Sequence, residues 1–156
     1  MTKPNPANPT LSISRPDLAS ALEQIGAEIE HQPLRSSALA RIMRETFHGS
    51  DAGGTWDWRM AYDLMQATAV QALLRGDNSE DDYYAAKLLA SRLLTETRRS
   101  EQQIRLQQFS TPLPFAALTV RAAAIRKGET VLEPSAGTGA PAAFAARAGA
   151  TLLLNE

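Results

Sequence analysis

The sequence contains no cysteine and only two histidines, His31 and His48. Disulfide bonds and thiolate metal sites are therefore excluded, and a histidine-rich metal cage is not expected. An excess of charge of one sign is also lacking, since 16 basic residues face 17 acidic residues and the net charge is -1. This balance predicts no general attraction to nucleic acid, so any contact with DNA would need a local basic patch or further sequence.

Long apolar runs are absent as well. No stretch approaches the ~18 apolar residues that a membrane span needs, and the N-terminus has no apolar core of a secretory signal. We therefore expect a soluble, cytoplasmic protein with no membrane partner. The prolines and asparagines at the start of the chain predict a disordered tail over residues 1–13.

Apolar residues at helical spacing dominate residues 14–107, which we interpret as a helical region of about four helices. Ser14, with Asp17 in the capping-box position, predicts the start of the first helix at about 15–31. The apolar residues of each helix are expected to pack into a helical domain that could fold alone.

The other three helices are predicted from their end signals. Pro33 can open the second helix and Gly49 can cap it, because proline lacks only a donor that the first turn does not use. Thr55 is predicted to cap the third helix. The fourth is expected to start at Ser79 and to run toward Arg99 or beyond.

Basic residues gather near the end of the helical region, at Arg92, Arg98, Arg99 and Arg105. They would suit a strip that binds phosphate groups, but Glu96 and Glu101 lie among them. The mixed charge favours a solvated helix face over a phosphate site.

The pattern changes over residues 108–156. The expected elements are a helix at about 114–126, a strand at 129–133, a glycine-bearing loop, a helix at 140–148 and an apolar strand at 151–155. The last strand is continuous enough for burial on both faces. Strand, tight loop, helix and strand predict the first βαβ unit of a parallel sheet, so we assign the chain to the α/β class although it is mostly helical.

The loop between these strands carries the chemistry. Glu133 comes at the carboxyl end of the first strand, where open α/β sheets bind ligands. Gly137 and Gly139 allow the backbone to bend tightly and to approach a ligand. Glu156 ends the second strand, where an acid can accept hydrogen bonds from a ribose diol. These features predict a site for an adenosine-containing cofactor.

The negative charge of Glu133 discriminates between a dinucleotide and S-adenosyl-L-methionine as the cofactor. Gly137, Gly139 and Ala142 also fit the loose pattern of dinucleotide-binding loops, so an NAD-binding fragment stays an alternative. Glu133 would face a pyrophosphate unfavourably but suits a cationic sulfonium and ammonium. This favours S-adenosyl-L-methionine.

The segment EPSAGTG, residues 133–139, resembles the first cofactor-binding motif of adenine-specific DNA methyltransferases. In that family a Thr-Pro segment often precedes the motif, and QFSTPLPFA resembles it through Thr111 and Pro112. The resemblance implies a Rossmann-like class I methyltransferase fold and implies that Thr111 and Glu133 contact the methionine moiety while Glu156 takes the ribose hydroxyls. The cofactor-binding residues that it implies are Thr111, Pro112, Glu133, Pro134, Ser135, Ala136, Gly137, Thr138, Gly139 and Glu156.

A second resemblance covers more of the chain. The resemblance lies in the order of the segments along the chain: a helical region, then TWDWRMAYDLMQA, QQFSTPLPFA, VLEPSAGTGA and LLLNE. This order is similar to the N-terminal region of bacterial strawberry notch-type methylase/helicase proteins. This implies DNA as the partner of the intact relative, and a helicase part after the methylase part.

The family's catalytic motif, Asn or Asp followed by Pro, Pro and an aromatic, is absent from the sequence; Asn5-Pro6 and Asn8-Pro9 are the nearest fragments. We therefore expect a fragment of an incomplete methyltransferase domain that binds cofactor weakly or not at all alone, and whose missing strands another chain could supply. A non-enzymatic helical binding module at residues 14–105 is the remaining alternative.

Overall fold

The computed structural model describes residues 15–76, 81–98, 104–105 and 110–155. Its elements, in chain order, are α1 (Arg15–His31), α2 (Ser36–Thr46), α3 (Trp58–Arg75), α4 (Asp82–Ala90), α6 (Leu113–Ala122), β1 (Thr130–Glu133), α7 (Ala140–Arg147) and β2 (Thr151–Leu154). The described chain is mostly helical, with one small sheet of two parallel strands. In this part of the chain, no helix combines the length and the apolar character needed to cross a lipid bilayer.

The first helix, α1, spans the residues that the sequence predicts. α2 is shorter than predicted at both ends. It begins at Ser36 rather than Pro33, because Leu34 turns into the core and its N–H donates to a main-chain carbonyl beyond α4 (2.8 Å). Phe47, not Gly49, is the C-terminal cap of α2.

The cap of α3 is Asp57 rather than the predicted Thr55. A carboxylate oxygen of Asp57 accepts the N–H of Met60 at 2.7 Å, which satisfies one of the free donors at the helix start. The hydroxyl of Thr55 instead donates to the carbonyl of Ser50 (3.2 Å) in the preceding loop. Both residue types can cap a helix, so the sequence alone did not separate them.

The fourth helix is much shorter than predicted, because α4 ends at Ala90 rather than near Arg99. The chain turns there so that Leu93 and Leu94 pack against the first core. Arg92 then donates from Nη1 to the last carbonyls of α1. At the other end of α4, Asp81 accepts the N–H of Tyr83 as the cap, while the predicted cap Ser79 lies outside the described residues.

Large apolar side chains form the first buried cluster, between α1, α2 and α3. Its fully buried members of greatest volume are Trp56, Ile25, Ile29, Leu39, Ile42, Met43 and Met65. The indole N–H of Trp56 donates to the carbonyl of Gly49 (3.1 Å), so this buried ring leaves no polar atom unpaired.

A second cluster, rich in alanine, lies between α3, α4, α6 and α7. Its members are Ala69, Leu73, Ala86, Leu113, Ala116, Ala117, Ala140 and Phe144. The cluster therefore joins residues on both sides of the boundary that the sequence predicts between 107 and 108. Arg147 of α7 adds a polar tie, because its Nε contacts Asp82 Oδ1 at 2.7 Å and its Nη1 donates to the carbonyl of Leu73 at 2.7 Å.

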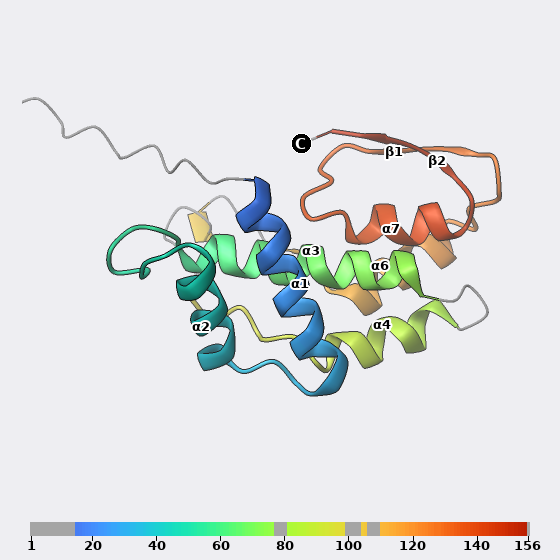
Figure 1. Ribbon diagram of the computed structural model, residues 1–156. Helices are drawn as coiled ribbons and strands as arrows, with labels where there is room; N and C mark the ends of the chain where they lie inside the picture. Colours follow the sequence, from blue (N-terminus) through green and yellow to red (C-terminus); the bar gives the residue numbers. More distant parts are fainter. Residues whose placement is uncertain (1–14, 77–80, 99–103, 106–109, 156) are drawn as a thin grey trace, which may run out of the picture.

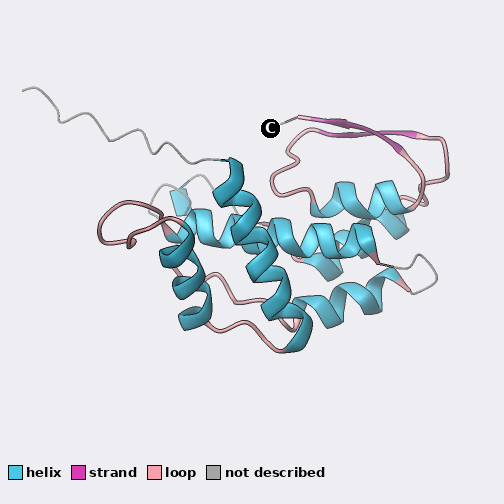
Figure 2. Cartoon of the chain, in the orientation of Figure 1, coloured by secondary structure: helices cyan, strands magenta, loops and turns pink. Residues whose placement is uncertain are grey.

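The sheet lies at one edge of the molecule, and the helices lie on one side of it (Figures 1 and 2). The two strands pair in parallel, with Thr130 opposite Thr151 and Glu133 opposite Leu154. α7 packs against both strands. The outer face stays uncovered in the described structure, where Leu132 is 65% exposed and Leu153 55% exposed. The apolar run of β2 suits burial on both faces, but none of the described residues covers the outer face.

Candidate functional site

A tight bend of six residues, 134–139, connects the carboxyl end of β1 to the start of α7. Gly137 and Gly139 both adopt the left-handed conformation, with φ of 50° and 87°. Residues with a side chain rarely take this conformation, so both glycines are needed for the turn. The N–H of Gly139 donates to the carbonyl of Ala136 at 2.7 Å, which closes the bend immediately before α7. The predicted glycine loop is therefore a compact turn outside the helix.

Glu133 lies at the tip of β1, where the sequence predicts it. Its side chain is half-buried, and its Oε1 accepts the N–H of Ser135 at 3.3 Å. This bond holds the carboxylate beside the bend, at the end of the sheet where ligands of α/β proteins bind. The first turn of α7 begins at the other end of the bend, and the free N–H groups of a helix start favour electron-rich ligand atoms.

Asn155 holds the bend in place, although it is not among the residues that the sequence predicts for the site. Its main-chain N–H donates to the carbonyl of Glu133 (3.0 Å), and its carbonyl accepts the N–H of Ala136 (2.9 Å). Its side-chain Nδ2 donates to the carbonyl of Pro134 at 3.2 Å. The signal in the sequence was a short polar residue at the carboxyl end of an apolar strand, next to the expected ribose acid.

The Thr-Pro segment lies at the start of α6. Thr111 and Pro112 are both exposed, and Pro112 occupies the cap position of that helix. Leu113, the next residue, shares the second buried cluster with Ala140, the first residue of α7. α6 packs on α7, so the residue after the Thr-Pro segment and the residue after the bend belong to the same cluster. Glu156, the predicted partner of the ribose, lies outside the described residues.

The arginines near the end of the helical region serve different purposes where the structure describes them. Arg92 donates to two carbonyls at the end of α1. The guanidinium of Arg98 lies over the ring of Trp58, at 4.2 Å from its centroid. Arg99 falls outside the described residues. These contacts support a structural use of Arg92 and Arg98 rather than a common phosphate strip.

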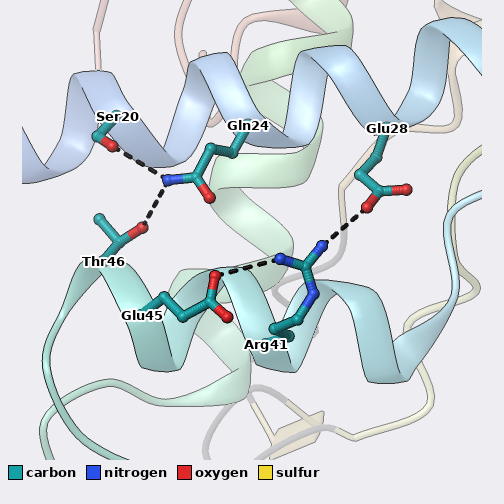
Figure 3. Close-up of polar contacts among 6 residues, drawn as sticks. All are labelled: Ser20, Gln24, Glu28, Arg41, Glu45 and Thr46. Carbon is teal, nitrogen blue, oxygen red and sulfur yellow. Dashed lines mark hydrogen bonds and ion pairs between the residues drawn. The ribbon is translucent and has the colours of Figure 1, made fainter.

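An open groove of about 320 Å³ lies between α1 and α2, far from the bend in sequence. Figure 3 shows the polar contacts of three of its lining residues, Gln24, Glu28 and Arg41. Arg41 contacts Glu28 at 2.9 Å and Glu45 at 3.1 Å, and Gln24 donates to Ser20 and Thr46. The groove therefore presents few unused polar groups to a ligand.

A scan against protein-family models, a search of curated proteins and a search of solved structures each find no match. Within the described ranges, no group of three or more histidine, cysteine or acidic side chains is placed to hold a metal ion. No comparison points to another site. We therefore take the bend at 134–139, with Glu133 and Asn155, as the candidate site on the basis of its geometry.

Proposed function

We propose that this chain is the cofactor-binding N-terminal part of an S-adenosyl-L-methionine-dependent methyltransferase that acts on adenine in DNA. The supporting observation is the arrangement at the carboxyl end of the parallel strands, where a carboxylate borders a bend with two left-handed glycines. This is the edge at which open α/β sheets bind their ligands. In this proposal β1, α7 and β2 begin a Rossmann-like fold.

The bend suits an adenosyl sulfonium better than a dinucleotide. The carboxylate of Glu133 would attract the cationic ammonium and sulfonium of the cofactor and would repel a pyrophosphate. An ideal Cβ added to Gly137 would meet nothing within 4 Å, so the backbone there is open on one side to a ligand. Thr111 and Glu133 would hold the methionine part, the main chain of residues 135–139 would enclose the cofactor, and Glu156 would accept the ribose hydroxyls.

The bound cofactor would supply an activated methyl group. In a complete enzyme of this class, the amino nitrogen of a flipped adenine would take that methyl group as the sulfur–methyl bond breaks, with S-adenosylhomocysteine as the leaving group and loss of a proton from the nitrogen. Correct positioning would provide much of the rate enhancement. The sequence of this chain has no Pro-Pro-aromatic catalytic motif. We therefore propose cofactor binding for these residues, and we assign DNA binding and methyl transfer to further polypeptide, as in a methylase/helicase protein.

The described sheet has only two strands, so we expect weak binding to this chain alone. Photo-crosslinking with methyl-tritiated S-adenosylmethionine can capture such a weak complex. The label should appear in the tryptic peptide of residues 128–147, which contains the whole bend. Glu133→Gln removes the charge that attracts the cofactor and should reduce labelling about tenfold.

Glu129→Gln is the matched control, because Glu129 lies just before the opposite end of β1, where its Oε2 accepts the N–H of Arg126. This variant should label like the wild type. Labelling that spreads over the helical region, or that is the same in both variants, would contradict the proposal. Competition by NAD in place of S-adenosylmethionine would favour the dinucleotide alternative.

A further inference from the structure

Two helices that contribute to the second cluster also expose large apolar side chains. On α4, Tyr84 is 69% exposed and Leu88 is 58% exposed. On α6, Phe115 and Leu118 are exposed as well, at 65% and 43%. The residues of each pair are three or four positions apart, so each pair lies on one side of its helix. We call these four residues the α4–α6 face.

The two exposed pairs belong to neighbouring helices. α4 and α6 pack against each other, and Arg121 near the end of α6 contacts Asp81 at the start of α4 (3.5 Å), so the two helices run antiparallel. Tyr84 follows this contact by three residues on α4, and Leu118 precedes it by three residues on α6. Both helices bury their opposite sides in the second cluster, so both exposed pairs are directed away from that cluster. Exposed apolar side chains that gather in this way mark interaction sites.

The charged groups around the α4–α6 face favour an acidic partner. Lys87 is exposed on α4, the side chain of Arg121 is 72% exposed on α6, and α6 contains no acidic residue. The two carboxylates at the start of α4 already bind groups of the protein, because Asp82 contacts Arg147 at 2.7 Å and Asp81 caps the helix. The apolar side chains are therefore flanked by cations.

We propose that the α4–α6 face binds an amphipathic helix of a partner protein, in which acidic residues border the apolar stripe. Apolar side chains on two adjacent helices can receive such a stripe, and the acidic residues would then meet Lys87 and Arg121. A second copy of this chain is a poorer match, because a symmetric contact would bring the same cations together. The net charge of -1 gives the chain no general attraction to nucleic acid or to an anionic membrane.

The test measures the binding of two synthetic, fluorescently labelled helical peptides to the full chain by fluorescence anisotropy. Both peptides carry leucine at the positions i, i+3, i+4 and i+7, and the flanking positions hold glutamate in one peptide and lysine in the other. The glutamate peptide should bind about tenfold more tightly than the lysine peptide. Leu88→Gln keeps a helix-forming residue but removes apolar surface, and it should weaken binding of the glutamate peptide about five- to tenfold.

Two further variants separate binding from folding. Lys87→Glu leaves the apolar surface intact, and it should weaken the glutamate peptide about threefold and strengthen the lysine peptide. Leu153→Thr is the control on the outer face of the sheet, where Leu153 is 55% exposed, and it should leave both affinities within about twofold.

Equal binding of the two peptides would overturn the proposal, as would no binding of the glutamate peptide or equal losses in Leu88→Gln and Leu153→Thr. Sedimentation of the chain without peptide tests the second copy as the occupant. A wild-type dimer that Leu88→Gln dissociates would assign the α4–α6 face to self-association and would also overturn the proposal. A wild-type monomer that prefers the glutamate peptide, and loses this preference in Lys87→Glu, would support it.

Discussion

The two buried clusters of this molecule contain different side chains. The first cluster, between α1, α2 and α3, contains tryptophan, isoleucine, leucine and methionine that are almost fully buried. The second contains mostly alanine, with Phe144 as its one aromatic side chain. Alanine lets helices approach closely but contributes little apolar surface to each contact. The second cluster therefore depends on a few large side chains, while the first cluster is stabilised by many.

The comparison predicts its largest effect at Phe144. Phe144→Ala should lower the free energy of unfolding by about 3–5 kcal/mol, because it leaves a cavity in a cluster with few other large side chains. Urea denaturation gives the magnitude, and hydrogen exchange should show protection lost in α6, α7 and the sheet before α1. Phe115→Ala is the control, since Phe115 is 65% exposed on α6 and its loss should cost no more than about 0.5 kcal/mol.

A smaller loss is expected at Arg147, whose side chain is 5% exposed and bonds to Asp82 and to two carbonyls near the end of α3. Arg147→Met should cost about 2–3 kcal/mol, because the carboxylate of Asp82 and two main-chain carbonyls lose a donor that is shielded from solvent. Thermal denaturation measures it. Arg121→Met should change stability by less than about 0.5 kcal/mol, since its contact with Asp81 is exposed and long at 3.5 Å. Similar losses of stability in both variants would argue against a stabilising role for the hydrogen bonds of Arg147.

Removal of the cap of α3 should cause a smaller loss of stability. Asp57→Ala should cost about 1 kcal/mol, because the N–H of Met60 loses its acceptor. Asp57→Asn keeps an acceptor oxygen and should restore most of this loss in a chemical denaturation series. A full loss in the asparagine variant would show that the side-chain oxygen is not what stabilises the helix start.

The smallest effect is expected in the groove between α1 and α2. Arg41→Gln should change stability by no more than about 0.5 kcal/mol, because Arg41 is 49% exposed and solvent screens its two ion pairs. The difference should fade as salt approaches about 1 M in the same denaturation assay. A loss that is large and independent of salt would mean that packing, not charge, explains the contribution of Arg41.

Local signals in the sequence predicted α1, the parallel strands and the bend at 134–139, because helix periodicity, a strand tip and two glycines act over a few residues. The early end of α4 could not be predicted in this way. Arg92 and Leu93 leave the helix to satisfy contacts with α1 and the first core, and such contacts depend on residues distant in the sequence. Choosing between Thr55 and Asp57 as the cap likewise required the loop that engages Thr55.

The bend was predicted where one segment forms it, but its contacts with a second segment were not predicted. Glu133 and the two glycines follow one another along the chain, so their pattern is visible in the sequence. Asn155 holds the bend from the second strand, and only the parallel register brings it there. The shared cluster of Leu113 and Ala140 also depends on helix packing that no local pattern encodes.

Chemical-shift mapping of the isotope-labelled chain can show whether the cofactor binds at the bend. Titration with millimolar S-adenosylmethionine should shift amide signals of residues 133–139 and Asn155, while the signals of α1 and α2 stay in place. Shifts confined to the groove residues Gln24, Glu28 and Arg41, with none in the bend, would contradict the account.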